Sequence, residues 1–571
     1  MGLGILEDKV LDHVPGTTRY FDDPDRPQTA DTLDAARGLK CDTSGSAPIV
    51  LHPQPSDDPN DPLNWPLWRR DVITLILSLT AIFATALGPI LAANTLTLSL
   101  WFGLDFTRIA LLTGYFLLGV GFAGFFFVPS GRIWGKRHLF ILGTLITIGS
   151  SAWGGAVGKN YTSFLWSRII QGVGTAPFES LVNAAVGDLY FVHERGKRMA
   201  FTNLAVFGGA FFTPVLVGKI THTIGWWWTF YLVSIFLAVC LVALVLFCPE
   251  TAFRRDAALN TDMGTAATTS GHNGSSDDLK KQDATSNTNP SSITTNGTHV
   301  DYKKKTFVQS LALFDGRKTD DSFFRLLFRP LPLFVQPAFL WACLIQGTMI
   351  GWTVFIGVVL AAIFLGPPLF WNEVSTGYAY LGPFVGALLG FAIAGGLADW
   401  SAKYLTRRNG GVYEPEFRIL LVIPQLVFGC MGLYGFAVTS QGTLTGANHW
   451  VVPIMFFGFE VCGMVIGAVA SSLYIVDAYR DLAVEGFTCL IIFKNMFSFG
   501  LTFKAYEWLV YGGIEETFHV LASVQVVVCL LSIPMYIYGK RNRSFFYRHD
   551  IIAMTVDRSS DWLNKVFHRK K

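Results

Sequence analysis

Long apolar segments alternate with short polar links along most of the chain. A membrane-spanning helix needs about 20 mostly apolar residues, and segments of this kind form two sets of six, separated by a polar stretch at 249–333. The first set covers 72–95, 109–130, 139–157, 162–187, 201–219 and 226–248, and the second covers 334–364, 374–399, 417–438, 449–476, 484–511 and 516–538. The pattern predicts an all-α membrane protein with twelve transmembrane helices in two six-helix halves.

The same pattern divides the chain into five regions. They are an N-terminal tail at 1–71, a six-helix bundle at 72–248, a central loop at 249–333, a second bundle at 334–539 and a C-terminal tail at 540–571. The central loop contains GTAATTSGHNGSSDD and DATSNTNPSSITTNGT, which are too poor in apolar residues to order themselves. We therefore expect a disordered central loop and a mostly flexible N-terminal tail.

Composition agrees with lipid as the solvent. Hydrophobic residues make up 51% of the 571 residues and charged residues 15%, whereas a soluble domain carries about 25% charged residues. The two tails and the central loop hold 53 of the 85 charged residues, which leaves 32 for the other 383 residues. A charge at the bilayer centre costs about 2.5–3.5 kcal/mol on insertion scales. Composition excludes a soluble enzyme, a collagen-like rod and a mainly disordered chain.

Charged residues in the short loops predict the orientation. The links after helices 2, 4, 8 and 10 carry ten Lys and Arg residues, against three in the opposite loops. The positive-inside rule therefore places both tails and the central loop in the cytoplasm. The ten are Arg132, Lys136, Arg137, Arg195, Lys197, Arg198, Lys403, Arg407, Arg408 and Arg480, and the three are Arg108, Lys159 and Lys219. Of the sequons, Asn160-Tyr-Thr alone then lies outside, as a possible glycosylation site close to the membrane.

The chain shows no sequence signature of catalysis or of a bound metal. It has no Walker motif, no nucleophile elbow and no His and Cys cluster at metal-ligand spacing. We therefore expect no enzyme activity, no cofactor and no metal. A net charge of +3 is too small to suggest nucleic acid as a partner. The expected partners are lipid, a small-molecule substrate and protons.

Helix 4 carries the most informative polar side chains. Arg168 and Glu179 are eleven residues apart, so they share a helix face to within about 20° at an axial separation of about 16 Å. Asn183 is one further turn along that face. Intramembrane polar groups line pathways or brace helices. Arg168 is either a hydrogen-bonded strut or part of a proton-coupling site, and Glu179 is either an interhelical partner or a titratable cavity carboxylate.

Polar residues in the other predicted helices give weaker indications of function. Glu460 lies near the middle of helix 10, either bonded to a neighbouring helix or facing the cavity. Lys494 and Asn495 in helix 11 are interpreted as bracing or snorkelling residues. Three further polar or aromatic residues are candidate cavity liners: Asn94, Gln346 and Trp352. Asp188-Leu-Tyr190 ends helix 4 and Asp477-Ala-Tyr479 ends helix 10, as expected for duplicated halves.

These motifs together resemble the major facilitator superfamily, and specifically its twelve-span fungal drug:proton antiporter group, near the polyamine and histidinol carriers. The resemblance covers about residues 50–545 and includes HPQPSDDPNDPLNWPLWRRD at 52–71, Pro249-Glu250-Thr251 after helix 6 and GLADW at 396–400. In helix 4, Leu165, Arg168, Gln171, Gly172 and Gly174 match the family's proton-coupling motif. The resemblance implies alternating access, with a cavity built from helices 1, 4, 7 and 10.

Two motifs depart from the family pattern. In the gating loop SGRIWGKR, Arg132 stands where the family has an Asp that pairs with a neighbouring helix, while Gly135, Lys136 and Arg137 are kept. Asp399 belongs to the corresponding loop of the second half. The antiporter motif of helix 5 keeps Gly209, Pro214 and Gly218, but Thr213 and Val217 replace glycines.

The sequence therefore predicts a secondary transporter of a small organic molecule. Proton-coupled efflux of a drug or secondary metabolite is the first choice, with Arg168 and Glu179 coupling protons and Glu460 contributing from the second half. Proton-coupled uptake of an organic cation such as a polyamine is the alternative, and a non-transporting membrane receptor is the alternative from another class. The resemblance implies the plasma membrane, with the vacuolar membrane as the other option, and a monomer is expected.

Overall fold

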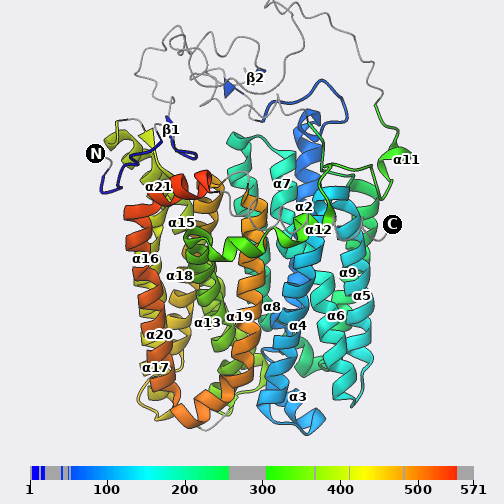
Figure 1. The fold of residues 1–571 in the computed structure, drawn as a ribbon. Coiled ribbons are helices and arrows are strands. Elements are labelled where there is room, and N and C mark those ends of the chain that lie inside the picture. The colour runs from blue at the N-terminus through cyan, green and yellow to red at the C-terminus, as the bar shows by residue number, and fades with distance from the viewer. Residues whose placement is uncertain are drawn as a thin grey trace, which may run out of the picture.

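The computed structural model describes residues 3–11, 14–19, 40–42, 49–50, 53–255, 304–365, 368–410, 412–479 and 482–549. The predicted loop segment 256–303, Arg480 in the link after helix 10, and the end of the C-terminal tail lie outside these residues. Figure 1 shows two groups of long, roughly parallel helices side by side, with β1 (Thr18–Arg19) and α21 (Ser532–Arg548) near the same end of the bundle. We call that end the terminal face and the other end the opposite face.

The first half consists of residues that precede the central loop. Its helices, in chain order, are α2 (Leu67–Ala86), the 3₁₀ turn η2 (Pro89–Leu91), α3 (Thr95–Phe102), α4 (Phe106–Trp134), α5 (Arg137–Ala156), α6 (Tyr161–Ser180), α7 (Val182–Leu189), α8 (Val192–Ile224) and α9 (Trp227–Phe247). A 3₁₀ turn, η1 (Pro62–Asn64), precedes α2, and the side chain of Asp61 caps it.

The connecting segment and the second half follow the same plan. The connection contains α11 (Phe307–Ser310), α12 (Phe323–Phe328) and η4 (Leu331–Val335). The second half contains α13 (Pro337–Leu365), α14 (Glu373–Tyr378), α15 (Leu381–Arg408), η5 (Pro415–Leu421), α16 (Val422–Gln425), the π-helical turn η6 (Leu426–Cys430), α17 (Met431–Leu444), α18 (Val451–Ala478), α19 (Ala483–Gly512), α20 (Ile514–Leu530) and α21 (Ser532–Arg548).

Ten helical stretches of the described chain are long and apolar enough to cross a membrane. The two other predicted spans correspond to α2 and to α6 with α7. Both are more polar than the rest: α2 begins with Arg69, Arg70 and Asp71, and α6 contains Arg168 and Glu179. The all-α, two-half fold predicted from the sequence is confirmed, although hydropathy alone identifies ten of its helices.

Several predicted helices are broken where the backbone chemistry requires it. Helix 1 ends at Ala86, before Gly88 and Pro89, and resumes as α3. Proline has no amide hydrogen and clashes with the preceding turn, so it interrupts a helix. Helix 4 is divided at Leu181, four residues after Pro177, into α6 and α7. The sequence pattern gave both as single segments because it detects apolar length and not backbone geometry.

Part of the N-terminal tail packs against the second half at the terminal face. The strand β1 (Thr18–Arg19) pairs antiparallel with β4 (Val412–Tyr413), and a second two-stranded pair joins β2 (Cys41–Asp42) to β3 (Ile49–Val50). The Leu6 amide donates to the carbonyl of Ile537 over 3.0 Å, and Ile5 is buried. Residues 20–39 and 43–48 of the predicted flexible tail lie outside the described chain.

Candidate functional site

The two halves meet along a seam that has α4 and α19 on one side of the molecule. Near the opposite face, the Phe106 and Tyr506 rings stack with centroids 5.6 Å apart. Further along, a Cβ atom on Gly114 would lie 2.1 Å from the Thr502 hydroxyl, and one on Gly121 would lie 2.5 Å from a Met496 methyl. Glycine therefore lets α4 approach α19 closely across the seam.

The other side of the seam is formed by α8 with α14 and α15. A Cβ on Gly218 would lie 2.3 Å from the Glu373 carbonyl oxygen, and the Pro214 carbonyl lies opposite Gly377. Gly209, by contrast, faces Ile82 of α2 within the first half. Two of the three predicted helix 5 motif residues thus lie at the contact between the halves, and the third lies at a contact inside one half.

Arg168 is fully buried inside the first half and makes hydrogen bonds from all three guanidinium nitrogens. They donate to the Leu112 carbonyl of α4 at 3.3 Å, to Gln171 Oε1 at 2.8 Å and to the Gly88 carbonyl at 3.4 Å. The guanidinium carbon also lies 4.8 Å from the centroid of the Phe116 ring. Arg168 therefore braces α6 against α4 and against the break in helix 1.

Glu179 forms an ion pair across the seam. Its Oε2 lies 2.8 Å from Lys494 Nζ of α19, and Asn495 Nδ2 donates to the same oxygen at 3.4 Å. Both charged side chains are largely buried, with 14% and 16% of their surface exposed. Glu179 lies about 27 Å along the helix from Tyr161, nearer the terminal face. The structure thus places the two predicted polar residues of helix 4 in different surroundings.

Glu460 is buried within the second half. Its Oε1 accepts a hydrogen bond of 2.8 Å from the Thr353 hydroxyl of α13, and its side chain is fully buried. The other oxygen, Oε2, has no hydrogen-bond partner among the residues that the structure describes. Gly432 of α17 packs against the Glu460 backbone so closely that a Cβ there would lie 2.3 Å from the Glu460 nitrogen. Ionising a buried carboxyl with an unpartnered oxygen carries a desolvation cost that no hydrogen bond to that oxygen offsets.

The other predicted cavity liners lie at separate points of the bundle. Asn94 is buried, and its side-chain oxygen has no hydrogen-bond partner in the described part of the chain. Asn183 bridges α7 and α8 by donating to Asn203 at 2.9 Å and accepting from Thr202 at 3.0 Å. Gln346 is half-buried and accepts from Ser471 at 3.3 Å. The Trp352 indole donates to Gln525 Oε1 at 3.0 Å, which fixes it within the second half.

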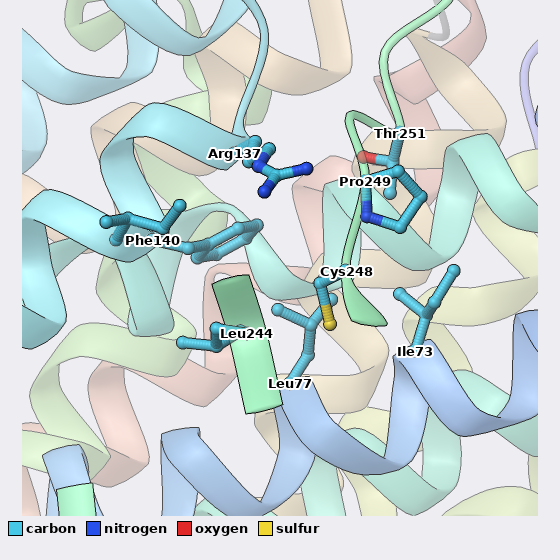
Figure 2. Close-up of a pocket in the computed structure, with 9 residues that line it drawn as sticks. Ile73, Leu77, Arg137, Phe140, Leu244, Cys248, Pro249 and Thr251 are labelled. Atoms are coloured by element: carbon cyan, nitrogen blue, oxygen red, sulfur yellow. The ribbon is translucent and has the colours of Figure 1, made fainter. Parts of the chain in front are cut away.

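The gating loop after α4 is held by a carboxylate that follows α9. Glu250 accepts the backbone amides of Lys136 at 2.9 Å and of Arg137 at 3.0 Å. Gly135 has φ +93°, and a Cβ there would lie 2.2 Å from a Glu250 carboxylate oxygen, so only glycine fits. Figure 2 shows Arg137 above Phe140 and beside the segment from Cys248 to Thr251, in a small crevice between α2, α5 and the end of α9.

The two remaining gating residues differ in their contacts. Arg132, at the position where the family has an Asp, forms an ion pair with Glu485 in the first turn of α19. Arg329 reaches the same Glu485 oxygen at 3.2 Å. A contact between the halves therefore exists at Arg132, with Glu485 as its acidic member. Asp399 is exposed on α15.

The two halves repeat one ion pair at the terminal face. Lys136 pairs with Asp188 at the end of α7 and donates to the Ala184 carbonyl at 2.9 Å. In the second half, Arg418 Nε lies 3.0 Å from Asp477 Oδ2 near the end of α18. Each Asp ends the fourth span of its half and meets a cation that follows the second span. The repeat inferred from Asp188 and Asp477 thus has a structural counterpart.

Residues just outside the bundle add two local contacts. Asp61 accepts from Arg255 at 3.0 and 2.7 Å, which joins the segment before α2 to the segment after α9. Burial raises the pKa of Asp61, but its hydrogen bonds and the charge of Arg255 outweigh burial and hold that pKa below its usual value. Asn160 is exposed and caps α6 by accepting the Ser163 amide at 3.0 Å.

Sequence reasoning missed most of the partners. Lys494 was assigned a bracing or snorkelling role, whereas it pairs with Glu179; a single lysine deep in an apolar helix is the signal that could have suggested a buried acidic partner. Glu485 and Arg329 were not singled out, and neither was Thr353. Among the described residues, no group of three or more His, Cys, Asp and Glu side chains is placed to hold a metal ion.

The fold and the seam define a multi-pass helical membrane transporter built from two similar halves. The sequence profile of the Major Facilitator Superfamily matches residues 73–484, which is more than half of the chain. The chain belongs to this family. Its relatives include Protein HOL1 of Saccharomyces cerevisiae, 24% identical over 93% of this chain and 95% of that protein. The MFS transporter cpaT of Aspergillus oryzae is 25% identical over 85% and 90%, respectively.

Solved structures support the fold. A proton:xylose symporter, XylE, superposes with a TM-score of 0.54 at 14% identity over 83% of this chain and 96% of that one. At this level of identity the similarity concerns the fold alone. The chain is therefore a transporter of the major facilitator superfamily and not an enzyme, as the sequence predicted.

Proposed function

We propose that this protein is a proton-coupled antiporter that exports a small organic compound. The observation that carries the proposal is the Glu179–Lys494 ion pair across the seam. Alternating access moves the two halves against each other, so a contact between α6 and α19 forms and breaks during the cycle. A carboxylate that loses its cationic partner in a largely buried place gains a proton more readily. Opening of the seam at the terminal face is thereby linked to protonation of Glu179.

Competition at one carboxylate explains exchange in opposite directions. Glu179 can be neutralised by Lys494, by a proton or by a cationic group of a substrate, and each excludes the others. A substrate that displaces the proton from Glu179 on one side of the membrane is released when Glu179 binds a proton on the other side. Net movement of substrate and proton is then opposite. Arg168 holds α6 in place for this step and does not itself exchange protons, because all its nitrogens are engaged.

The proposal includes an orientation and a membrane. The excess of Lys and Arg in the terminal-face loops assigns that face to the cytoplasm. Asn160, at the opposite face, would then be extracellular. The plasma membrane is proposed because the protein resembles fungal exporters, and a monomer is proposed because each chain carries both halves of the seam.

Reconstituted protein tests the coupling directly. We would prepare proteoliposomes of known orientation, impose a pH gradient and follow the lumenal pH while adding spermidine and then a panel of amphipathic drugs. Antiport predicts that substrate and protons move in opposite directions. Glu179→Gln is expected to reduce proton movement by at least tenfold and to remove the pH dependence of substrate flux. Movement in the same direction would instead support uptake of an organic cation.

A matched control separates coupling from folding. Glu507→Gln removes an exposed carboxylate that pairs with Lys504 at 2.5 Å within α19, so its flux should equal that of the wild type. All variants would be compared at equal reconstituted amounts. If Glu179→Gln retained coupled flux with an unchanged pH dependence, the assignment of Glu179 would be wrong. Flux without proton movement in the wild type would contradict proton coupling as a whole.

A further inference from the structure

The short helix α12 (Phe323–Phe328) presents three different kinds of side chain on its sides. Leu326 and Leu327 are buried against the protein. Phe324 and Phe328, which are four residues apart and therefore on one side, are 68% and 46% exposed. Arg325 lies beside them, 45% exposed and 3.8 Å from Asp321, and Arg329 follows one turn later at the C-cap. An apolar exposed side next to a basic side is typical of a helix that lies at a membrane surface.

The contacts of α12 place it beside the lipid-facing span α4. The Phe323 ring packs on Trp134 with centroids 6.0 Å apart, and the Phe328 ring lies 6.5 Å from Phe125. Phe125 precedes Trp134 by nine residues, or about 13 Å along α4. Figure 1 shows α12 crossing the front of the bundle near the terminal ends of α4 and α19. The exposed aromatic rings thus continue the apolar surface of a membrane span.

The same segment also contacts the second half. Arg329 lies 3.2 Å from Glu485 of α19, and the Cys489 thiol donates to the Pro330 carbonyl at 3.2 Å. Leu331 and Val335 of η4 extend the exposed apolar side beyond α12. The connecting segment therefore bridges both halves at the seam while its outer side has no protein neighbour among the described residues that buries it. A continuous exposed apolar surface of this kind requires a covering partner.

The charge of the connecting segment indicates which kind of molecule covers this surface. Residues 304–335 carry six basic and three acidic side chains, a net charge of +3. The basic ones are Lys304, Lys305, Arg317, Lys318, Arg325 and Arg329, and the acidic ones are Asp315, Asp320 and Asp321. Basic residues beside a membrane span attract anionic headgroups. Phosphate matches the planar donor arrangement of arginine.

We propose that α12 and η4 form a binding site for an anionic glycerophospholipid in the leaflet at the terminal face. Phe324 and Phe328 contact the acyl chains, and Arg325 with Arg329 contacts the headgroup phosphate. Because Arg329 also pairs with Glu485, a bound headgroup competes for one of the two arginines that Glu485 holds. Lipid composition thereby adjusts a contact between the two halves, whichever way the substrate moves.

Fluorescence quenching by brominated lipids tests the site without any transport assay. We would replace Phe324 by Cys in a Cys41→Ser background, label it with an environment-sensitive dye and reconstitute the full chain with brominated phosphatidylglycerol or brominated phosphatidylcholine. The seven other cysteines are buried, so labelling is expected at position 324. Brominated phosphatidylglycerol should quench at least twofold more strongly than phosphatidylcholine at the same mole fraction.

Two comparisons make the experiment selective. Arg325→Gln should bring the quenching ratio close to one while leaving Arg329 and Glu485 in place. Val510→Cys provides a matched lipid-exposed label on α19 near Glu507, Glu515 and Glu516, and its ratio should be one or less because those carboxylates repel anionic headgroups. Equal quenching by the two lipids at position 324 would overturn the headgroup preference. No quenching by either would mean that protein, for example a second copy of this chain, covers the surface.

Discussion

Two buried charges lie at comparable depths in the two halves, and their surroundings differ sharply. Arg168 is 20 residues before Asp188, and Glu460 is 17 residues before Asp477, the equivalent carboxylates at the terminal face. Arg168 has partners for all three of its nitrogens. Glu460 has one partner, Thr353, and an oxygen with none. Every nitrogen of Arg168 therefore makes a hydrogen bond, whereas one oxygen of Glu460 has no partner among the described residues.

This difference in hydrogen bonding bears on which of the two buried groups is able to change its protonation state. A satisfied arginine keeps its proton at any physiological pH and rigidifies the helices that it joins. A buried carboxyl with a free oxygen pays a desolvation cost as an anion and loses that cost when it takes up a proton. We infer that the first half supplies a fixed frame around helix 4, while the second half contains a group able to bind and release a proton. Glu179 and Lys494 connect the two.

The largest effect on stability is expected from Arg168→Leu. This change leaves the Leu112 and Gly88 carbonyls and Gln171 without their donor inside the first half. Each buried polar group left unsatisfied costs about 1–3 kcal/mol, so the loss should exceed about 3 kcal/mol and most of the protein should fail to fold. Thermal unfolding in detergent measures this. Arg108→Leu is the control, because Arg108 is exposed and pairs only loosely with Asp105 at 3.6 Å.

Replacing Glu460 is expected to change the pH dependence of transport and to leave the thermal stability almost unchanged. Glu460→Gln keeps the shape and can retain the hydrogen bond with Thr353, so thermal stability should change by less than about 1 kcal/mol. The pH dependence of transport should nevertheless shift, because a titratable site has been removed. A loss of stability as large as that of Arg168→Leu would show that Glu460 is also a structural group. An unchanged pH profile would show that its free oxygen takes no part in coupling.

The sequence predicted the architecture better than the site because the two depend on different information. Apolar length and loop charge determine the spans, so the two halves and the repeat of Asp188 and Asp477 could be recognised. Partners such as Lys494 for Glu179, or Glu485 for Arg132, depend on how two halves far apart in sequence pack together, and no spacing rule encodes that. The breaks after Ala86 and at Leu181 were not predicted either, because apolar length does not report the local effect of Pro89 or Pro177 on the backbone.

The smallest predicted effect on stability concerns the two equivalent ion pairs at the terminal face. Asp188 accepts from Lys136 and, at 3.4 Å, from the Thr251 hydroxyl, whereas Asp477 accepts from Arg418 Nε at 3.0 Å and from the Tyr413 hydroxyl at 2.5 Å. Both pairs are partly exposed, and ion pairs of this kind contribute about 1 kcal/mol or less. Asp477→Asn should therefore reduce stability somewhat more than Asp188→Asn, since the hydroxyl that donates to Asp477 lies closer to its acceptor than the hydroxyl that donates to Asp188. Parallel melting curves of the two variants measure the difference. A larger loss for Asp188→Asn would mean that the first half relies on its terminal-face pair more than the longer hydrogen bond from Thr251 suggests, and the two pairs would then not be equivalent in the two halves.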